Sequence, residues 1–391
     1  MVEARRHMAG VGRAAGVGGT ARALGVSGAA GVTGPAGLQL IAGRSAPARS
    51  LPGLLPSLPD LGRALLGAIR AGWQRAVAVN RPLAVVGALM IASLAGSVLG
   101  LLVDPRLITG APAWLKPAKF AISITIYAFT FLWLLSYVRG HPRLVGLVAA
   151  ITAAGTAVEW VIIAGQAWRG TTSHFNQATP LDAALYHIMA AQIVLVWLAA
   201  MATAVLLVRQ RLTDPAFAWS LRLAVVIACV GMGLAFLMTR PTALQRADWA
   251  AGQPEKIVGA HAVGVRDGGP GLPLVGWSTE GGDLRVGHFV GLHGMQVLPF
   301  AGWLLTRRRP AWLGRRERLV LVWIVAASYL GLTLLVTWQA LRGQPLVAPD
   351  GLTLSVLGAL IAAGGTAAGT VLVLARRRLS VQVRAGRAAA A

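Results

Sequence analysis

The chain has 391 residues, of which 56% are hydrophobic and 13% charged, and its mean hydropathy is +0.65. Soluble domains carry about 25% charged residues, so this composition excludes an ordinary soluble protein and indicates a polytopic membrane protein. The formal net charge of +23 does not indicate nucleic-acid binding, because the basic residues are scattered among short loops and lack interleaved aromatic residues.

Two segments precede the apolar part of the chain. Residues 1–55 are rich in Gly, Ala, Arg and Pro with almost no aromatic residues, and such a composition predicts a disordered tail. In residues 56–81, apolar side chains such as Leu65 and Ile69 recur at helical spacing and are opposed by arginines such as Arg70. This pattern predicts a basic amphipathic helix on the cytoplasmic face of a membrane; a plain extension of the first span is the alternative.

The transmembrane domain is predicted over residues 82–376. Each of its apolar runs has about 20 residues, which is the length that crosses a bilayer: 83–104, 117–138, 144–165, 184–208, 221–239, 287–305, 319–338 and 354–375. Before the sixth run lies the glycine-rich polar loop 240–286, which has no low-complexity composition and is expected to be ordered. The predicted fold is therefore all-α, an integral membrane helical bundle with about eight transmembrane helices and a long ordered outer loop.

Charge placement orients these spans. With the N-terminus in the cytoplasm, the inner segments hold 26 of the 36 Lys and Arg residues and four of the 13 Asp and Glu residues. Short basic loops stay cytoplasmic, so we expect a multi-pass plasma-membrane protein with both termini inside and a basic tail at 377–391. Stripes of small residues at spacings of four residues, with one step of three, predict that the first and last spans each approach other helices closely: Ala92, Gly96 and Gly100, then Gly358, Ala362, Gly365 and Gly369.

Histidines gather at the predicted outer side. The five that map there are candidate metal ligands: His174, His187, His261, His288 and His293. Neutral imidazole suits Zn, Cu and Fe, and His187 and His293 lie at similar depth, as two axial haem ligands must. The chain has no His-Glu-x-x-His and no Cys-x-x-Cys-His motif, so a transition metal, a haem or neither remains open.

Other ionisable residues share this depth. Glu159 lies inside a span, where a carboxylate must face the bundle and find a partner, and Lys116 or Lys119 is the expected one. The predicted catalytic set is Glu159, Lys119, Asp283 and Arg285. The predicted ligand-binding set, chosen by helical phase and by place in the outer loops, is Lys116, Ser123, Tyr127, Gln166, Arg169, Asn176 and Gln296. A purely structural Glu–Lys pair is the alternative.

Three functions fit this pattern. The first is a membrane enzyme or redox protein, with a metal or haem, that acts on a small or lipid-soluble substrate. The second is a secondary transporter, although transporters place polar groups near the midplane, and here the inner half is almost wholly apolar. The third is a structural or sensory membrane protein. The architecture resembles the haem A synthase family, but its Glu-x-x-His motif and internal repeat are missing, so the resemblance assigns no residues.

Overall fold

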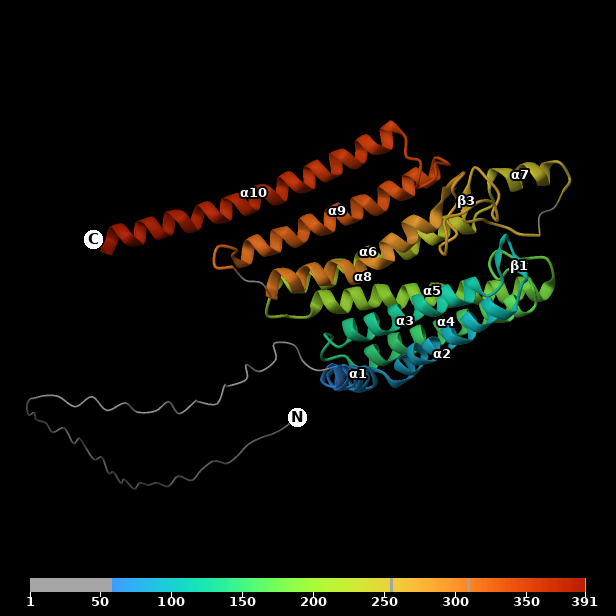
Figure 1. The fold of residues 1–391 in the computed structure, drawn as a ribbon, viewed down its shortest axis with the longest axis horizontal. Coiled ribbons are helices and arrows are strands. Elements are labelled where there is room, and N and C mark those ends of the chain that lie inside the picture. Colours follow the sequence, from blue (N-terminus) through green and yellow to red (C-terminus); the bar gives the residue numbers. More distant parts are fainter. Residues whose placement is uncertain (1–57, 254–255, 308–309, 391) are drawn as a thin grey trace, which may run out of the picture. The chain divides into compact units, whose positions relative to one another are not determined.

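The computed structural model describes residues 58–253, 256–307 and 310–390. The tail predicted over residues 1–55 lies outside these ranges. Eight of the described helices are long and apolar enough to cross a membrane, which confirms the predicted all-α polytopic bundle. They run alongside one another (Figure 1) and are α2 (Arg81–Val103), α3 (Leu115–Leu135), α4 (Pro142–Trp168), α5 (Pro180–Arg209), α6 (Pro215–Leu234), α8 (Leu284–Arg307), α9 (Arg315–Leu341) and α10 (Gly351–Ala390).

Local sequence signals start several of these helices. Asn80, Thr179 and Asp214 are the N-caps of α2, α5 and α6, and each side chain accepts hydrogen bonds from backbone N–H groups of the first turn. A proline follows within the first two helical positions in all three cases. Proline is pre-organised for the first helical turn and loses no hydrogen bond there, so the helix starts are encoded locally.

Glycines on α8 allow its closest contacts. A Cβ on Gly291 would lie 2.5 Å from Cα of Gly231 on α6, and a Cβ on Gly287 would clash with Thr337 on α9. Small residues let helix backbones approach closely and gain van der Waals contact in a membrane. One face of α8 is therefore fixed against α6 and α9, which directs the opposite face, with Gln296, toward α3.

The small-residue stripes expected to pack within the chain behave differently. A Cβ on Gly96, Gly358, Gly365 or Gly369 would meet nothing within 4 Å, whereas Gly100 packs against Trp114. The packing prediction is therefore wrong for most of these positions. A spacing of four residues identifies one face of a helix, but it does not identify what that face meets.

The polar connections gather at one end of the bundle, which we call the loop end (Figure 1). A short hairpin pairs β1 (Leu107–Ile108) with β2 (Ala111–Pro112). The long loop before α8 contains η1 (Ala235–Thr239), α7 (Ala243–Ala250) and the antiparallel pair β3 (Ala262–Val263) and β4 (Gly282–Asp283). Gln245 ties this loop together by donating to the carbonyls of Ile257 and Gly259 at 2.9 and 3.0 Å.

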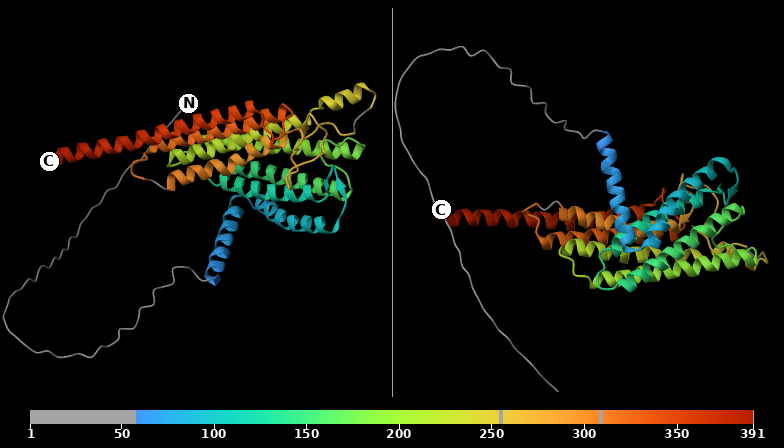
Figure 2. Two further views of the ribbon diagram at one scale, coloured as in Figure 1. Left: turned by 45° about the horizontal axis from the view of Figure 1, so that its top comes forward. Right: turned by 90° about the horizontal axis from the view of Figure 1, so that it is seen from below.

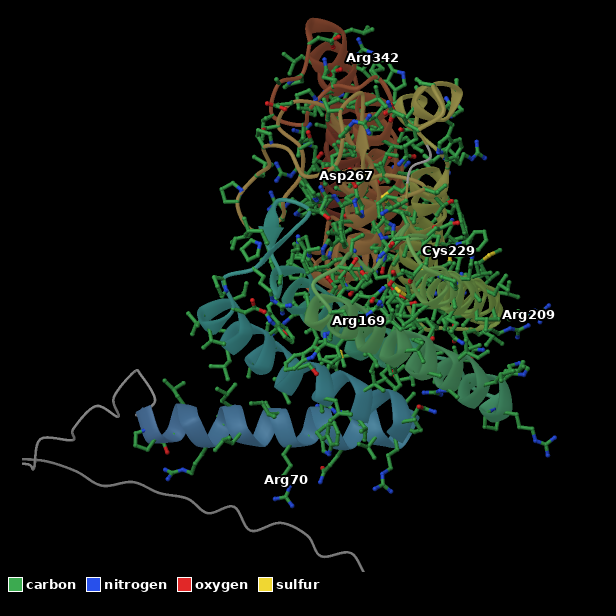
Figure 3. All side chains as sticks on the ribbon, turned by 90° about the vertical axis from the view of Figure 1, so that its right-hand side faces the viewer. Arg70, Arg169, Arg209, Cys229, Asp267 and Arg342 are labelled. Atoms are coloured by element: carbon green, nitrogen blue, oxygen red, sulfur yellow. The ribbon has the colours of Figure 1, made fainter. Side chains whose placement is uncertain are left out.

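Two helices extend past the bundle. Helix α1 (Leu58–Val79) lies across the direction of the spans (Figure 2), with Leu65 and Ile69 exposed. Arg70 points away from the bundle (Figure 3). The placement of helix α1 on a membrane surface stays a prediction. Helix α10 continues to Ala390 through the segment predicted as a basic tail, because Ala, Arg, Leu and Gln are strong helix formers.

Candidate functional site

Three elements bring a lysine, a histidine and a glutamate together at the loop end. Nζ of Lys116, in the first turn of α3, lies 3.1 Å from Nδ1 of His174. Nε2 of the same imidazole lies 3.4 Å from Oε1 of Glu159 on α4. Ser173 Oγ also lies 3.1 Å from Nδ1 of His174. We call Lys116, Glu159, Ser173 and His174 the relay cluster.

The expected direct pair between Glu159 and a lysine is therefore wrong. The turn between α4 and α5 folds back over the helix ends and places the His174 ring between the two charges. Burial, and then the neighbouring Lys116, hold the pKa of His174 below its usual range, so the ring is neutral at pH 7. A neutral imidazole can accept at one nitrogen and donate at the other, which makes the cluster a continuous hydrogen-bonded chain.

Glu159 has an unused hydrogen-bonding atom. The residue is 6% exposed, and its Oε2 is buried without a hydrogen-bond partner among the described residues. Buried polar atoms are almost always paired, because an unpaired one loses its hydration for nothing in return. Such an atom in a native structure retains hydrogen-bonding capacity for a proton or a ligand group.

Neighbouring contacts hold the relay cluster in place. Nε1 of Trp160 on α4 donates to the carbonyl of Pro117 on α3 at 3.1 Å, which fixes the two helices beside each other. Phe120 packs against the His174 ring with centroids 5.8 Å apart. Asn176, a predicted ligand-binding residue, is 1% exposed and uses its amide on Thr171, Thr172 and the Ala178 N–H. Its contacts shape the turn.

A second histidine at the loop end is paired with an aspartate. Nδ1 of His261 lies 2.7 Å from Oδ2 of Asp267, whose carboxylate also accepts from the backbone N–H groups of His261 and Ala262. Burial lowers the pKa of His261 to about 4. Burial acts to raise the pKa of Asp267, but the His261 ring and these N–H groups hold it below its usual range. We call this pair the His–Asp dyad.

The dyad has a defined tautomer. An ionised carboxylate only accepts hydrogen bonds, so the proton of the neutral His261 ring resides on Nδ1 and leaves a lone pair on Nε2. A carboxylate that fixes the tautomer of a neighbouring imidazole is the arrangement used by general-base histidines. Phe175 lies between the two histidines, with ring centroids 5.1 Å from His261 and 5.9 Å from His174.

The side chains of Lys119 on α3 and Arg285 on α8 also bind the loop before α8. Lys119 Nζ donates to the carbonyl of Val275 at 3.0 Å, and Arg285 donates to the carbonyl of Gly276 at 2.5 Å. Arg285 also forms an ion pair with Asp283, which is 1% exposed and accepts from the Ser278 N–H. Of the predicted catalytic residues, Lys119, Asp283 and Arg285 therefore meet around one loop, and Glu159 belongs to the relay cluster.

Two predicted ligand-binding residues, Gln166 and Arg169, hold the start of α5. Oδ1 of Asp182, in the first turn of α5, accepts from Gln166 at 2.9 Å and from Arg169 at 2.7 Å. Thr179 donates to Oδ2 of Asp182 and accepts from its backbone N–H, as an N-cap does. We call Gln166, Arg169, Thr179 and Asp182 the cap cluster. Both Asp182 oxygens are satisfied within it, so the cluster fixes the start of α5.

The predicted metal ligands do not converge. Within the ranges that the structure describes, no group of three or more His, Cys, Asp and Glu side chains is placed to share a metal ion. His187 and His293, the expected axial ligands of a haem, both have exposed side chains. His288 directs Nδ1 to the Gly231 carbonyl at 2.8 Å. Metal or haem binding stays a prediction without support from the geometry.

The remaining predicted residues lie along α3 and α8. Ser123 is exposed, and the Tyr127 hydroxyl is buried without a hydrogen-bond partner among the described residues. Gln296 donates to Thr130 at 3.0 Å and lies 3.2 Å from the His293 ring. Through this contact the polar face of α3 meets α8.

Sequence reasoning identified Asp267 only as one ionisable residue of the glycine-rich loop, without a specific role, and did not identify Ser173. A weak signal exists for Asp267, since it is a carboxylate in the same glycine-rich loop as His261. Ser173 gives no signal beyond its position next to His174. Comparison of the chain with protein-family models, with curated proteins and with solved structures gives no match, so a function can be inferred only from the geometry of the chain itself.

Proposed function

We propose that this protein is a multi-pass membrane enzyme that performs general acid–base chemistry on a small substrate at its loop end. The observation that carries the proposal is the part-buried Lys116–His174–Glu159 chain with its unpartnered carboxylate oxygen. Side chains that exchange protons at a positioned site accelerate reactions by about 10²–10⁴-fold. If the cluster were only a structural ion pair, an unsatisfied acceptor would lower the stability of the folded protein and serve no purpose.

The His–Asp dyad supplies a base in this proposal. His261 is neutral at pH 7 and carries its lone pair on Nε2, so it can take a proton from a bound substrate. Asp267 then stabilises the imidazolium that forms. In the relay cluster, Lys116 Nζ donates to Nδ1 of His174, and the Nε2 proton of the ring faces the Glu159 carboxylate. When Lys116 passes a proton to Nδ1, the Nε2 proton moves to the carboxylate, and Lys116 becomes a neutral amine that can take a proton from a substrate. Such proton movement requires the unpartnered oxygen of Glu159 to exchange with the site.

We further propose that the loop end faces the outside of the plasma membrane and that both termini are cytoplasmic. The support is the charge distribution along the sequence, because the segments predicted to be cytoplasmic hold 26 of the 36 Lys and Arg residues and short basic loops stay inside. A transporter is the second candidate. It is less well supported, because Leu134, Leu207 and Leu221 pack in one apolar cluster near the opposite ends of α3, α5 and α6 from the loop end.

The proposal is tested by substrate profiling. Purified protein in nanodiscs is incubated with polar and lipid extracts of the source membranes, and mass spectrometry compares wild type with the Glu159→Gln and His261→Asn variants. We expect wild type to consume at least one compound and both variants to lose about 10²-fold or more of that rate, while Lys256→Met, a change at an exposed loop position, keeps it. Extracts that wild type leaves unchanged, or that both variants change equally fast, contradict the proposal.

A further inference from the structure

Helices α3 and α8 are bridged at two levels. At the first level, Lys119 and Arg285 hold the successive carbonyls of Val275 and Gly276 at 3.0 and 2.5 Å. At the second, Thr130 accepts from Gln296 at 3.0 Å. The two levels are separated on each helix by 11 residues, or about 16 Å at 1.5 Å per residue. We call the facing residues between these levels the α3–α8 seam.

Polar groups lie along this seam within the apolar helices α3 and α8. Ser123, one turn after Lys119, is exposed, and so is His293 beside Gln296. The Tyr127 hydroxyl, one turn further along α3, is buried without a partner among the described residues. Hydrocarbon cannot satisfy a polar group, and each unsatisfied group costs free energy there. The seam is therefore better suited to an amphipathic molecule than to bulk lipid tails.

Charge at the loop end of the seam indicates the head group. Arg285 is paired with Asp283, and Lys116 reaches Glu159 through His174. Lys119 is half-buried and donates to a neutral carbonyl, and within the described residues it forms no ion pair with a carboxylate. A lysine ammonium next to a membrane seam is complementary to an anionic head group, and Lys119 lies one turn from Lys116 of the relay cluster.

We propose that the site takes an anionic single-chain amphiphile, with its head group at Lys119 and its apolar chain along the α3–α8 seam. This inference rests on the proposed function, because it names the substrate class of the same site. An acyl chain entering from the bilayer would present its head group to the relay cluster without crossing water. The loop carbonyls of Val275 and Gly276 would release Lys119 and Arg285 to the ligand.

The test measures thermal unfolding in phosphatidylcholine nanodiscs with three probes. Oleate has a charged head and a chain, acetate has the charged head alone, and oleyl alcohol has the chain with a neutral head. We expect oleate to raise the unfolding midpoint by about 2–4 °C at roughly fivefold excess over its Kd. A rise of equal size with acetate or with oleyl alcohol overturns the proposal, because it removes the need for the chain or for the charge.

Two pairs of variants test where oleate binds. Lys119→Met should abolish the oleate shift, while Lys256→Met, a lysine in an exposed part of the loop, keeps it. Ser123→Trp, which fills the seam, should also abolish the shift, while Ile122→Trp, at the neighbouring exposed position, keeps it. A shift that survives in both Lys119→Met and Ser123→Trp overturns the proposal. If either of these variants does not fold, Lys119→Gln and Ser123→Leu are measured in its place.

Glu159→Gln separates this inference from the proposed function. The variant should lose turnover and keep the oleate shift, because Glu159 contacts His174 rather than the seam. Turnover without any oleate shift in wild type overturns the substrate class and leaves the acid–base proposal standing. An oleate shift in a wild-type protein that shows no turnover supports a lipid-binding site and contradicts the acid–base proposal.

Discussion

The relay cluster and the cap cluster use similar residues at the same end of α4, yet their hydrogen bonding differs. In the cap cluster, Asp182 accepts from Gln166, Arg169 and Thr179, and both carboxylate oxygens are paired. In the relay cluster, Glu159 is paired through one oxygen at 3.4 Å and its other oxygen has no partner among the described residues. A fully satisfied network stabilises one arrangement of the chain, whereas an incompletely satisfied one retains hydrogen-bonding capacity for a ligand or a proton.

The cap cluster is also separated from the His–Asp dyad. Viewed onto the loop end, Arg169 of the cap cluster lies near the end of α4, and Asp267 of the His–Asp dyad lies among the loops over the bundle (Figure 3). The cap cluster fixes the turn between α4 and α5, and that turn presents His174 to Lys116 and Glu159. Structural and chemical roles therefore belong to different residues and can be tested separately.

The largest expected difference in stability is between variants of the two buried carboxylates, Asp182 and Glu159. Asp182→Ala should lower the free energy of unfolding by about 3 kcal/mol, because Arg169 and Gln166 lose a buried acceptor. Glu159→Gln should change it by less than about 1 kcal/mol, because the isosteric amide removes a charge that is already incompletely paired. Unfolding in SDS, followed by circular dichroism, measures both. Equal losses would show that Glu159 is as structural as Asp182.

Between pH 6.5 and 4, the dyad should make stability depend on pH. The pKa of His261 falls from its ordinary 6.5 to about 4 on folding, so between these values the unfolded state binds more protons. Stability is therefore full above pH 6.5 and decreases as the pH falls toward 4, by on the order of 3 kcal/mol. SDS unfolding at several pH values measures this slope.

Variants identify the side chain that causes this pH dependence of stability. His261→Asn should reduce the dependence between pH 6.5 and 4, because one titrating ring is removed, and His174, whose pKa is also lowered on folding, accounts for part of what remains. His187→Asn, at an exposed position on α5, should leave the dependence as in wild type. A slope that persists unchanged in His261→Asn would assign it to other groups and would remove the reason to regard His261 as a buried neutral base.

The smallest expected effects come from the two hydroxyl groups beside the clusters. Thr179→Ala should cost about 1 kcal/mol of stability, because it removes the N-cap of α5. Ser173→Ala should cost less than about 0.5 kcal/mol, since Lys116 still reaches Nδ1 of His174 without it. The same SDS titrations give both values. A larger loss for Ser173→Ala would mean that the relay cluster also stabilises the turn.

Much of the fold could be predicted from the sequence. Hydropathy and charge are local properties, so the eight spans, the ordered loop before α8 and the polar face of α3 follow from residue spacing. The stripes at Gly358 and Gly96 show the limit of that reasoning, because open space faces them while the tight contacts form at Gly291 and Gly231. Helical spacing defines a face, but the partner of that face depends on how the helices are rotated and ordered.

The candidate site, too, could be predicted from the sequence only in part. Residue order alone indicates that most histidines and acidic side chains collect near one end of the spans, because the segments at the other end carry mainly arginine. The folded arrangement is needed to show which of them meet: His174 joins Lys116 across 58 residues of chain, and Asp267 rather than a metal orients His261. The reason is that these contacts depend on the paths of two long loops, and loop paths are set by distant hydrogen bonds and packing that residue spacing does not encode.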